Sequence, residues 1–385
     1  MKRVLSVQHY PKYGGPHNEI VALHQLFRDA GFETVVAITD EPGSAHEALE
    51  PIVETHQIQL DRLHGFRDMK ALARTATSFS PDVKRLSNLI RTLDIDLVRV
   101  HGAHNPQGAL AARRTKTPLV WVLSSDIGGL LGRSLAATVT PRMADAVLIT
   151  GQSLKNQYRG ISKFPNVFTY YAPANLERFR LTDSVRRSSA RVALGIDPDR
   201  PVVGTIATLS PQKDPVLFAR VAVEMAHRQP EVQFVLVGGA APHHQHLLDE
   251  VHRVISDGGV ADRVHLTGER RDVPEILGAF DIMLITSRFE GTATTVAEAL
   301  ACGIPVVASD VGAVRDVVID GKTGFVVDRT VDSFCLAIEK LLADPEGSRH
   351  MGEEGRQLVL EISSAEASCQ QQLLSYEWAL RQQNR

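Results

Sequence analysis

Short runs of β-branched residues alternate along the chain with helix-length stretches in which hydrophobic residues recur every three or four positions. This alternation is typical of parallel sheets whose strands are joined by crossover helices. In residues 19–30, for example, Ile20, Leu23 and Phe27 share one helical face, and Gly31 ends the segment. The whole pattern occurs twice, so we predict an α/β protein with two doubly wound, Rossmann-like domains.

The predicted strands fall into two series. The first comprises residues 3–7, 33–39, 96–101, 119–123 and 146–150. The second comprises residues 202–207, 233–238, 264–267, 282–286, 305–308 and 324–327. Further helices are predicted at residues 81–93, 333–343 and 364–380.

The domain boundary is predicted next to the arginine-rich stretch 182–191, which precedes a turn sequence, Gly-Ile-Asp-Pro. This gives an N-terminal domain over 1–180, a C-terminal domain over 181–363 and a last helix, 364–385, that crosses the domain junction. Ligands of doubly wound sheets bind beyond the carboxyl ends of the strands. We therefore expect the site in the loops after the strands, where the domains face a cleft.

The composition supports a globular protein and narrows its function. A chain of 385 residues, 43% of them hydrophobic, exceeds what one core usually serves. We find no signal-peptide core and no apolar stretch near the ~20 residues of a membrane span, so a cytoplasmic protein is expected. Three widely spaced cysteines argue against a disulfide framework or a zinc site. Aromatic residues are not interleaved with basic clusters, so no nucleic-acid partner is expected.

Charge differs between the two halves of the chain. Residues 1–180 contain 22 Lys and Arg against 16 Asp and Glu, whereas the remainder contains 20 against 29. The basic half could attract an anionic acceptor or the anionic inner face of a membrane. Within it, Arg67, Lys70 and Arg74 share a helical face that could rest on anionic lipid. Ordinary solvent-exposed surface explains the charge balance equally well and is the favoured explanation of the helical face, so peripheral membrane contact is one of two open alternatives.

The segment from Ser287 to Asp328 carries the most specific chemistry. Predicted strand 282–286 is followed by a glycine and then by a helix whose first turn consists of small residues. Free backbone N–H groups at such a helix start form an anion site suited to phosphate. The residues expected to line it are Gly291, Thr292, Thr294 and Thr295.

Two carboxylates, Glu290 and Glu298, flank this expected phosphate site and are separated by seven residues. Carboxylates do not bind phosphate, so we expect them to accept hydrogen bonds from hydroxyl groups on either side of it. A nucleotide-diphosphate sugar has sugar hydroxyls on one side of its phosphates and ribose hydroxyls on the other. The spacing therefore favours a nucleotide-sugar donor.

This glutamate spacing, followed by Ala-Cys-Gly-Ile-Pro-Val-Val-Ala-Ser, resembles the donor-site signature of the family 4 retaining glycosyltransferases with the GT-B fold. The resemblance covers essentially the whole chain. Three further segments are similar to family loops: Gly14-Gly15 to the acceptor-side loop, residues 209–213 to the diphosphate-binding loop, and Thr267-Gly268 with Val273 to the base-binding region.

The resemblance implies retaining transfer of a sugar from a UDP-sugar or GDP-mannose to a hydroxyl acceptor, in the biosynthesis of cell-envelope polysaccharide, glycolipid or a secondary metabolite. Glu290 would hold the transferred sugar, Glu298 the ribose, and Lys213 would neutralise the leaving phosphates. The family is thought to react on one face of the sugar, with the leaving phosphate helping to take the acceptor's proton. Neither a metal, a cofactor nor a carboxylate nucleophile is then expected.

On the donor side the chain departs from the family pattern at one cation. Thr208 stands where many members have an arginine five residues before the lysine. One cationic contact to the diphosphate is therefore missing. Arg288 and Arg315 are the two residues that could replace it.

On the acceptor side a histidine is missing. Ser124 stands where members often have a histidine after the fifth strand. Asp126 or His101, each near the end of a strand, could take over its polar role. A structural role is an equal alternative for His101, since histidines at strand ends are often structural.

The sequence allows two other functions and suggests one other site. A non-catalytic partner would keep the fold and nucleotide binding without turnover, and Thr208 and Ser124 motivate it. A nucleotide-sugar epimerase on the same architecture would change the sugar on an intact nucleotide. His243, His244 and His246 could suggest a metal site, but their spacing does not match a common ligand set, and a solvated loop entering a helix is predicted.

Overall fold

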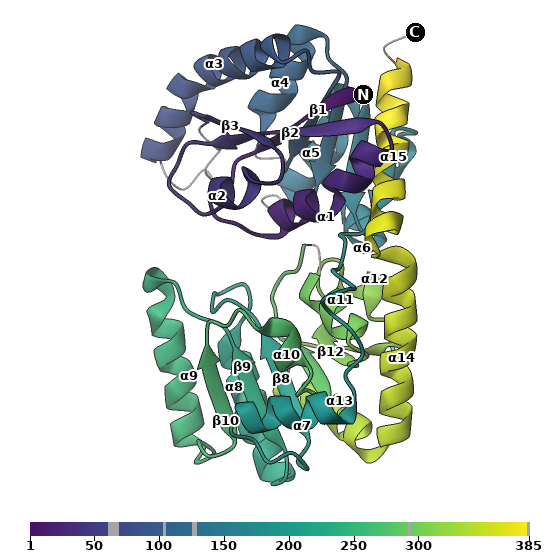
Figure 1. Cartoon of the computed structure of the whole chain (residues 1–385). Coiled ribbons are helices and arrows are strands. Elements are labelled where there is room, and N and C mark those ends of the chain that lie inside the picture. Colours follow the sequence, from purple (N-terminus) through teal and green to yellow (C-terminus); the bar gives the residue numbers. More distant parts are fainter. Residues whose placement is uncertain (61–68, 103–104, 125–128, 292–293, 383–385) are drawn as a thin grey trace. The chain divides into compact units, whose positions relative to one another are not determined.

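Two parallel sheets organise the chain (Figure 1). The computed structural model describes residues 1–60, 69–102, 105–124, 129–291 and 294–382, and only the backbone of residues 69–77 and 129–131. The chain forms two compact units, residues 1–173 with 365–385, and residues 174–364. Each unit is a Rossmann-like α/β domain, which confirms the predicted fold class.

The first unit contains a seven-stranded sheet with the order β3-β2-β1-β4-β5-β6-β7, and its paired strands run parallel. Its strands are β1 (Lys2–Gln8), β2 (Phe32–Thr39), β3 (Glu54–Ile58), β4 (Leu97–His101), β5 (Leu119–Leu123), β6 (Ala146–Thr150) and β7 (Val167–Tyr170). Its helices are α1 (Gly15–Asp29), α2 (Ala45–Leu49), α3 (Met69–Thr92), α4 (Pro106–Thr115), α5 (Gly129–Met143), α6 (Gln152–Gln157), the short η1 (Ile161–Lys163) and α15 (Ala365–Gln382). Strands β4, β5 and β6 are buried throughout, as expected where helices cover both faces of a sheet.

The second unit contains a six-stranded parallel sheet with the order β10-β9-β8-β11-β12-β13. Its strands are β8 (Val202–Ile206), β9 (Gln233–Val237), β10 (Val264–Gly268), β11 (Ile282–Ile285), β12 (Val306–Ser309) and β13 (Gly324–Val327). Its helices are α7 (Ser184–Ala193), α8 (Pro215–Arg228), η2 (Pro242–His244), α9 (Gln245–Asp257), α10 (Val273–Leu277), α11 (Thr294–Ala301), α12 (Val314–Val317), α13 (Val331–Ala343) and α14 (Pro345–Ile362).

All the predicted strands are present, within a residue or two of their predicted bounds, but the edge strands β3 and β7 were not predicted, and neither were several helices, α14 among them. Strand β3, Glu-Thr-His-Gln-Ile, is mainly polar because it lies at the partly exposed edge of its sheet. Helix α14 contains glycines, which weaken a helix prediction. Its Gly352 and Gly355 lie so close to Gly303 and Leu300 that a Cβ atom would clash with either neighbour. Close packing against α11, which the local pattern does not show, explains these glycines.

The arginine-rich stretch 182–191, predicted as a polar boundary segment, is mostly helix α7. Arg191 is buried and donates to the carbonyl oxygens of Ala279 and Pro198 and, at 2.5 Å, to the Asp281 carboxylate. Arg187 donates to the other oxygen of Asp281 at 2.9 Å. These contacts fix α7 on the second unit, so its arginines have a structural use that composition alone hides.

The last helix, α15, packs on the first unit (Figure 1). Its Tyr376 ring stacks on Phe27 of α1 with 5.3 Å between centroids and meets Phe32 of β2 edge-on at 5.5 Å. Trp378 meets Phe168 of β7 edge-on at 5.8 Å. Such aromatic pairs add to the apolar area that the helix buries. The C-terminal segment therefore completes one face of the first sheet.

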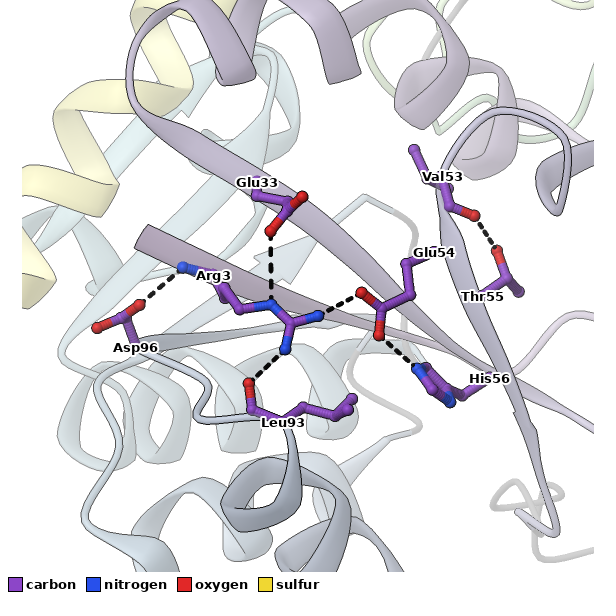
Figure 2. A network of polar contacts seen from close by, with 8 residues as sticks. All are labelled: Arg3, Glu33, Val53, Glu54, Thr55, His56, Leu93 and Asp96. Carbon is purple, nitrogen blue, oxygen red and sulfur yellow. Dashed lines mark hydrogen bonds and ion pairs between the residues drawn. The ribbon is translucent and has the colours of Figure 1, made fainter. Parts of the chain in front are cut away.

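Arg3 ties together the amino ends of the strands on one side of the first sheet (Figure 2). Its guanidinium lies between Glu33, with Nε 3.5 Å from Oε2, and Glu54, which begins the next strand along. It also donates to the Leu93 carbonyl oxygen at 2.6 Å, and its backbone N–H donates to Asp96 at 2.7 Å. One side chain thus holds the polar edge strand β3 and the end of α3 in register with β1.

We predict that Arg3→Ala lowers the free energy of unfolding by about 1–2 kcal/mol, because two carboxylates and a carbonyl group lose their shared donor. Chemical denaturation of the whole chain measures this. Arg114→Ala, at an exposed arginine on α4, is the control and should cost less than about 0.5 kcal/mol. Equal losses in the two variants would contradict the role given to Arg3.

Candidate functional site

The strand order of the second sheet marks where a ligand is expected. The chain winds from β8 toward β10 on one side and from β11 toward β13 on the other. The loops after β8 and β11 therefore leave the sheet in opposite directions at adjacent strands. In open α/β sheets this switch point forms the ligand crevice.

Lys213 and Glu290 meet at this switch point. Lys213 lies in the loop after β8 and Glu290 in the loop after β11. The Lys213 ammonium donates to both carboxylate oxygens of Glu290, at 2.7 and 2.8 Å. The Ser287 hydroxyl donates to the same carboxylate at 2.5 Å. Glu290 is only 7% exposed, so this charge is satisfied largely by protein groups.

A small hollow opens beside this ion pair. Its polar lining consists of Thr205, Lys213, Thr286, Ser287, Glu290 and Thr295. Thr295 belongs to the first turn of α11, so the hollow lies next to the start of that helix. A positive side chain, hydroxyl groups and a helix N-terminus form an environment suited to an anionic oxygen-rich ligand. The structure thus brings together three of the residues predicted from sequence: Lys213, Glu290 and Thr295.

The two loops are also joined by their main chains. The Arg288 N–H donates to the Gln212 carbonyl oxygen at 2.7 Å, and the Gln212 side chain donates to the Phe289 carbonyl oxygen at 2.9 Å. The Thr286 hydroxyl lies 3.1 Å from the carbonyl oxygen of Lys213. Sequence reasoning missed these supporting residues because their partners lie more than seventy positions away. The position of each directly after a strand was the one available signal.

Gly312 fixes the approach of a third loop, which follows β12. Its φ of +55° lies in the left-handed region, and a Cβ atom at this position would lie 1.5 Å from the Glu290 carbonyl oxygen. Any side chain here would have to displace the Glu290 backbone. A glycine is therefore required both by conformation and by close approach.

We predict that Gly312→Ala lowers the free energy of unfolding by about 3 kcal/mol, because strain and a backbone clash add together. Gly321→Ala is a matched control. Gly321 has φ of +71°, yet no described atom lies within 4 Å of its Cβ position, so only the strain of about 1–2 kcal/mol should appear. Denaturation curves of the two variants compare them, and equal losses would show that the approach to Glu290 is not tight.

Glu298 lies in α11 and is partly buried. Burial raises the pKa of its carboxyl from 4.5 to about 7, and the Arg178 charge opposes this only in part. A carboxylate that loses solvation without gaining a full partner destabilises the folded chain. Such a cost is common at sites that bind a ligand.

The raised pKa of Glu298 predicts how stability depends on pH. A carboxyl whose pKa is higher in the folded chain contributes stability at low pH, and that contribution is lost as pH rises from about 4.5 to about 7. Glu298→Gln carries no charge, so it should be more stable than the wild type at pH 8 by about 2 kcal/mol, with no gain at pH 4. Thermal denaturation at the two pH values measures this. Glu231→Gln, at an exposed glutamate, is the control, and a gain that is the same at both pH values would refute the assignment.

The predicted base-binding residues lie further along the same edge of the sheet. Gly268 ends β10 with φ of +68°, and Val273 begins α10 and packs on the core. Strand β10 lies two strands from β8, roughly 10 Å away.

Thr208 is exposed in the loop after β8. Of the predicted phosphate-site residues, Gly291 precedes α11 and Thr294 begins it; Thr292 lies outside the described residues.

Arg288 and Arg315 are the two residues that could supply the cation missing at Thr208, and both form ion pairs with nearby carboxylates. Arg315 pairs bidentately with Asp310 at 2.6 and 2.8 Å. Arg288 pairs with Asp214 at 2.9 Å. Each arginine therefore already neutralises a carboxylate. Lys213 is the cation that the structure places against Glu290.

In the first unit the switch point lies between β1 and β4, and the predicted acceptor-side glycines follow β1. Gly14 precedes α1 and Gly15 begins it. Gly14 has φ of −171°, which any residue adopts, and no described atom lies within 4 Å of either Cβ position. The fold of this unit therefore does not explain the two glycines.

His101 ends β4 and is buried. Burial lowers the pKa of its imidazole to about 4, although the nearby Glu19 carboxylate opposes this shift. Glu19 forms a buried ion pair with Arg99 and accepts from the Tyr170 hydroxyl at 3.1 Å. His101 is thus a neutral residue beside a buried ion pair. Asp126, the other candidate for this role, lies outside the described residues.

Two remaining expectations concern metals and membranes. His243, His244 and His246 lie where the short η2 turn enters α9, which confirms the predicted loop entering a helix. Within the described ranges, no cluster of three or more His, Cys, Asp or Glu side chains is arranged to hold a metal ion. Likewise, no described helix is both long and apolar enough to cross a membrane. The side chains of Arg67, Lys70 and Arg74 lie outside those that the structure describes, so the basic helical face that they are predicted to form stays a prediction.

Comparison with known proteins connects this site to a family. The family model of the glycosyl transferases group 1 matches residues 186–358. A GDP-mannose-dependent alpha-(1-6)-phosphatidylinositol monomannoside mannosyltransferase of Mycolicibacterium smegmatis is 32% identical over 295 residues, 72% of this chain and 75% of that protein. A D-inositol 3-phosphate glycosyltransferase of Rhodococcus jostii is 34% identical over 188 residues, 47% of this chain and 41% of that protein. The chain therefore belongs to the group 1 glycosyltransferases.

Solved structures agree on the fold. Anabaena HepE, crystallised with UDP and glucose, has a TM-score of 0.81 and 21% identity, covering 98% of this chain and 100% of that one. Sucrose-phosphate synthase of Thermosynechococcus elongatus has a TM-score of 0.77 and 19% identity, covering 99% and 100%. At these identities the likeness concerns architecture, and it confirms the predicted GT-B type of two Rossmann-like domains.

Proposed function

We propose that the chain is a retaining glycosyltransferase that moves a sugar from a nucleotide-diphosphate donor, a UDP-sugar or GDP-mannose, to a hydroxyl acceptor. The observation that carries this proposal is the Lys213–Glu290 pair at the switch point of the second sheet. It combines a cation for phosphate with a carboxylate for hydroxyl groups. The mannosyltransferase name of the mycobacterial relative supports GDP-mannose, whereas HepE was solved with UDP.

The spacing along the sheet suits such a donor. With the diphosphate beside Lys213 and the start of α11, the base would reach toward Gly268 and Val273, roughly 10 Å along the sheet. Glu298, in the same helix, would accept hydrogen bonds from the ribose hydroxyls, and those bonds would favour its ionised form. Glu290 would hold hydroxyls of the transferred sugar.

Retention at the reacting carbon would follow from attack on the face that the leaving diphosphate occupies. Glu290 already accepts from Lys213 and Ser287, so its carboxylate is better suited to hold hydroxyls than to act as a nucleophile. Lys213 would stabilise the charge that develops on the leaving diphosphate, and the diphosphate oxygen would take the acceptor's proton. We propose that this chemistry needs no metal ion, so EDTA should leave the turnover unchanged.

The acceptor is proposed to be a hydroxyl compound of cell-envelope or secondary-metabolite biosynthesis, met in the cytoplasm or at the inner membrane face. The relatives named for phosphatidylinositol monomannoside and inositol 3-phosphate support this range, as does an alpha-D-kanosaminyltransferase of Streptomyces kanamyceticus that is 28% identical over 226 residues. Gly14 and Gly15 would let the acceptor approach the start of α1 closely.

The experiment that tests the function is thermal denaturation of the whole protein against a panel of UDP-, GDP- and ADP-sugars. A ligand that binds only the folded chain raises the melting temperature, by about 3 °C or more at a hundredfold excess over Kd. We expect a shift with one nucleotide class, reduced in Glu290→Ala and Lys213→Ala. The Asp332→Asn variant, which alters an exposed carboxylate on α13, should shift like the wild type. The absence of any shift would refute the donor site.

Hydrolysis of the donor without acceptor separates this function from the second candidate. A non-catalytic partner is favoured by the exposed Thr208 and by the engagement of Arg288 and Arg315 with carboxylates. It would bind the nucleotide without releasing sugar. A transferase should release sugar slowly, and release should fall at least tenfold in Lys213→Ala, which loses a charge-assisted contact.

A further inference from the structure

The peptide between Lys213 and Asp214 separates two hollows of the second unit. Lys213 lines the hollow that contains Glu290, whereas Asp214 lines a second hollow with Arg288 and Arg329. Asp214 has φ of +48° and ψ of 60°, in the left-handed region that few residues other than glycine adopt. This turn directs the two neighbouring side chains into different hollows.

The Asp214 carboxylate does not serve the helix that it precedes. Aspartate before a helix commonly caps it, yet Asp214 makes no side-chain cap hydrogen bond to α8. Its Oδ2 instead lies 2.9 Å from the Arg288 guanidinium and also contacts that of Arg329. The Asp214 side chain is 12% exposed and that of Arg329 is 29% exposed, so this pair interacts with less screening than a surface pair, whereas the Arg288 side chain is 60% exposed.

These contacts join three loops of one sheet edge. Asp214 follows β8, Arg288 follows β11 and Arg329 follows β13. The Thr286 hydroxyl lies 3.2 Å from the Asp214 carbonyl oxygen and 3.1 Å from that of Lys213. Two arginines therefore hold the side chain of the strained turn, and a threonine contacts its main-chain carbonyl oxygens.

We propose that Asp214 is a positioning residue for the transferase: through Arg288 and Arg329 it holds the turn that aims the Lys213 ammonium at the donor diphosphate. This inference rests on the proposed function. When the carboxylate is removed, the two arginines no longer hold the turn, and Lys213 leaves its place beside Glu290. Removal of the carboxylate should therefore weaken binding of the phosphate groups of the ligand and leave binding of its nucleoside unchanged.

The test uses Asp214→Asn, which keeps the side-chain shape and tolerates left-handed φ, and Asp214→Gly, which removes the strain together with the carboxylate. Dissociation constants are measured for UDP and GDP, and by competition for uridine and guanosine. We expect UDP or GDP, whichever the wild type binds, to bind about tenfold more weakly to both variants. The affinity for the corresponding nucleoside should be unchanged. A general loss of structure would weaken both ligands.

A double-mutant cycle with Lys213→Ala gives the second readout. Because Asp214 acts through Lys213, Asp214→Asn should add no further loss in the Lys213→Ala background. Asp332→Asn, which also removes a carboxylate paired with an arginine, is the matched control and should leave all affinities unchanged.

Three outcomes would overturn the inference. The first is unchanged affinity for UDP and GDP in both Asp214 variants, and the second is an equal loss of affinity for the nucleoside. The third is that Asp214→Asn causes its full loss of diphosphate affinity in the Lys213→Ala background as well. If Asp214→Asn fails to fold, Asp214→Gly alone decides between these results. A wild-type chain that binds neither UDP nor GDP would instead refute the proposed function on which the inference rests.

Discussion

The second unit is organised around one ion pair, in which Lys213 donates to both carboxylate oxygens of Glu290. The pair exists because β8 and β11 are adjacent in the sheet. In the sequence, 75 residues separate the end of β8 from the start of β11, and they include β9 and β10 on the other side of β8. Gly312 and the Gln212–Arg288 hydrogen bond then bring the surrounding main chains close enough to exclude most solvent from Glu290. A charge pair so enclosed keeps its strength only while its geometry is maintained.

The sequence predicts what is local and misses what depends on contacts across the fold. Hydrophobic runs locate every strand except the edge strands β3 and β7. Strand β3 is polar because Arg3 and the sheet edge stabilise it, and α14 contains glycines because it packs closely on α11. The same division holds at the site. Glu290, Glu298 and Lys213 could be selected by motif, whereas Asp214, Thr286 and Ser287 matter only through partners that a linear pattern does not reveal.

Two features of the second unit reduce its stability where the donor is proposed to bind. Glu298 carries a pKa raised by burial, and Asp214 adopts a left-handed conformation. Burial of Glu298 costs solvation that the Arg178 charge offsets only in part, and the left-handed conformation of Asp214 carries backbone strain. Strain and poor solvation at one edge of a sheet are typical of sites that gain their missing partners from a ligand.

The carboxyl edges of the two sheets differ in the kind of recognition they can offer. In the first unit His101 is neutral, Glu19 is satisfied by Arg99 and Tyr170, and the space beside Gly14 and Gly15 is open among the described residues. In the second unit the Lys213–Glu290 ion pair and the start of α11 line a hollow together with hydroxyl groups. A charged edge suits the diphosphate of a donor, because that group is the same in every nucleotide-diphosphate sugar. An open edge suits selection by shape, so members of one fold can share a donor chemistry while their acceptors differ.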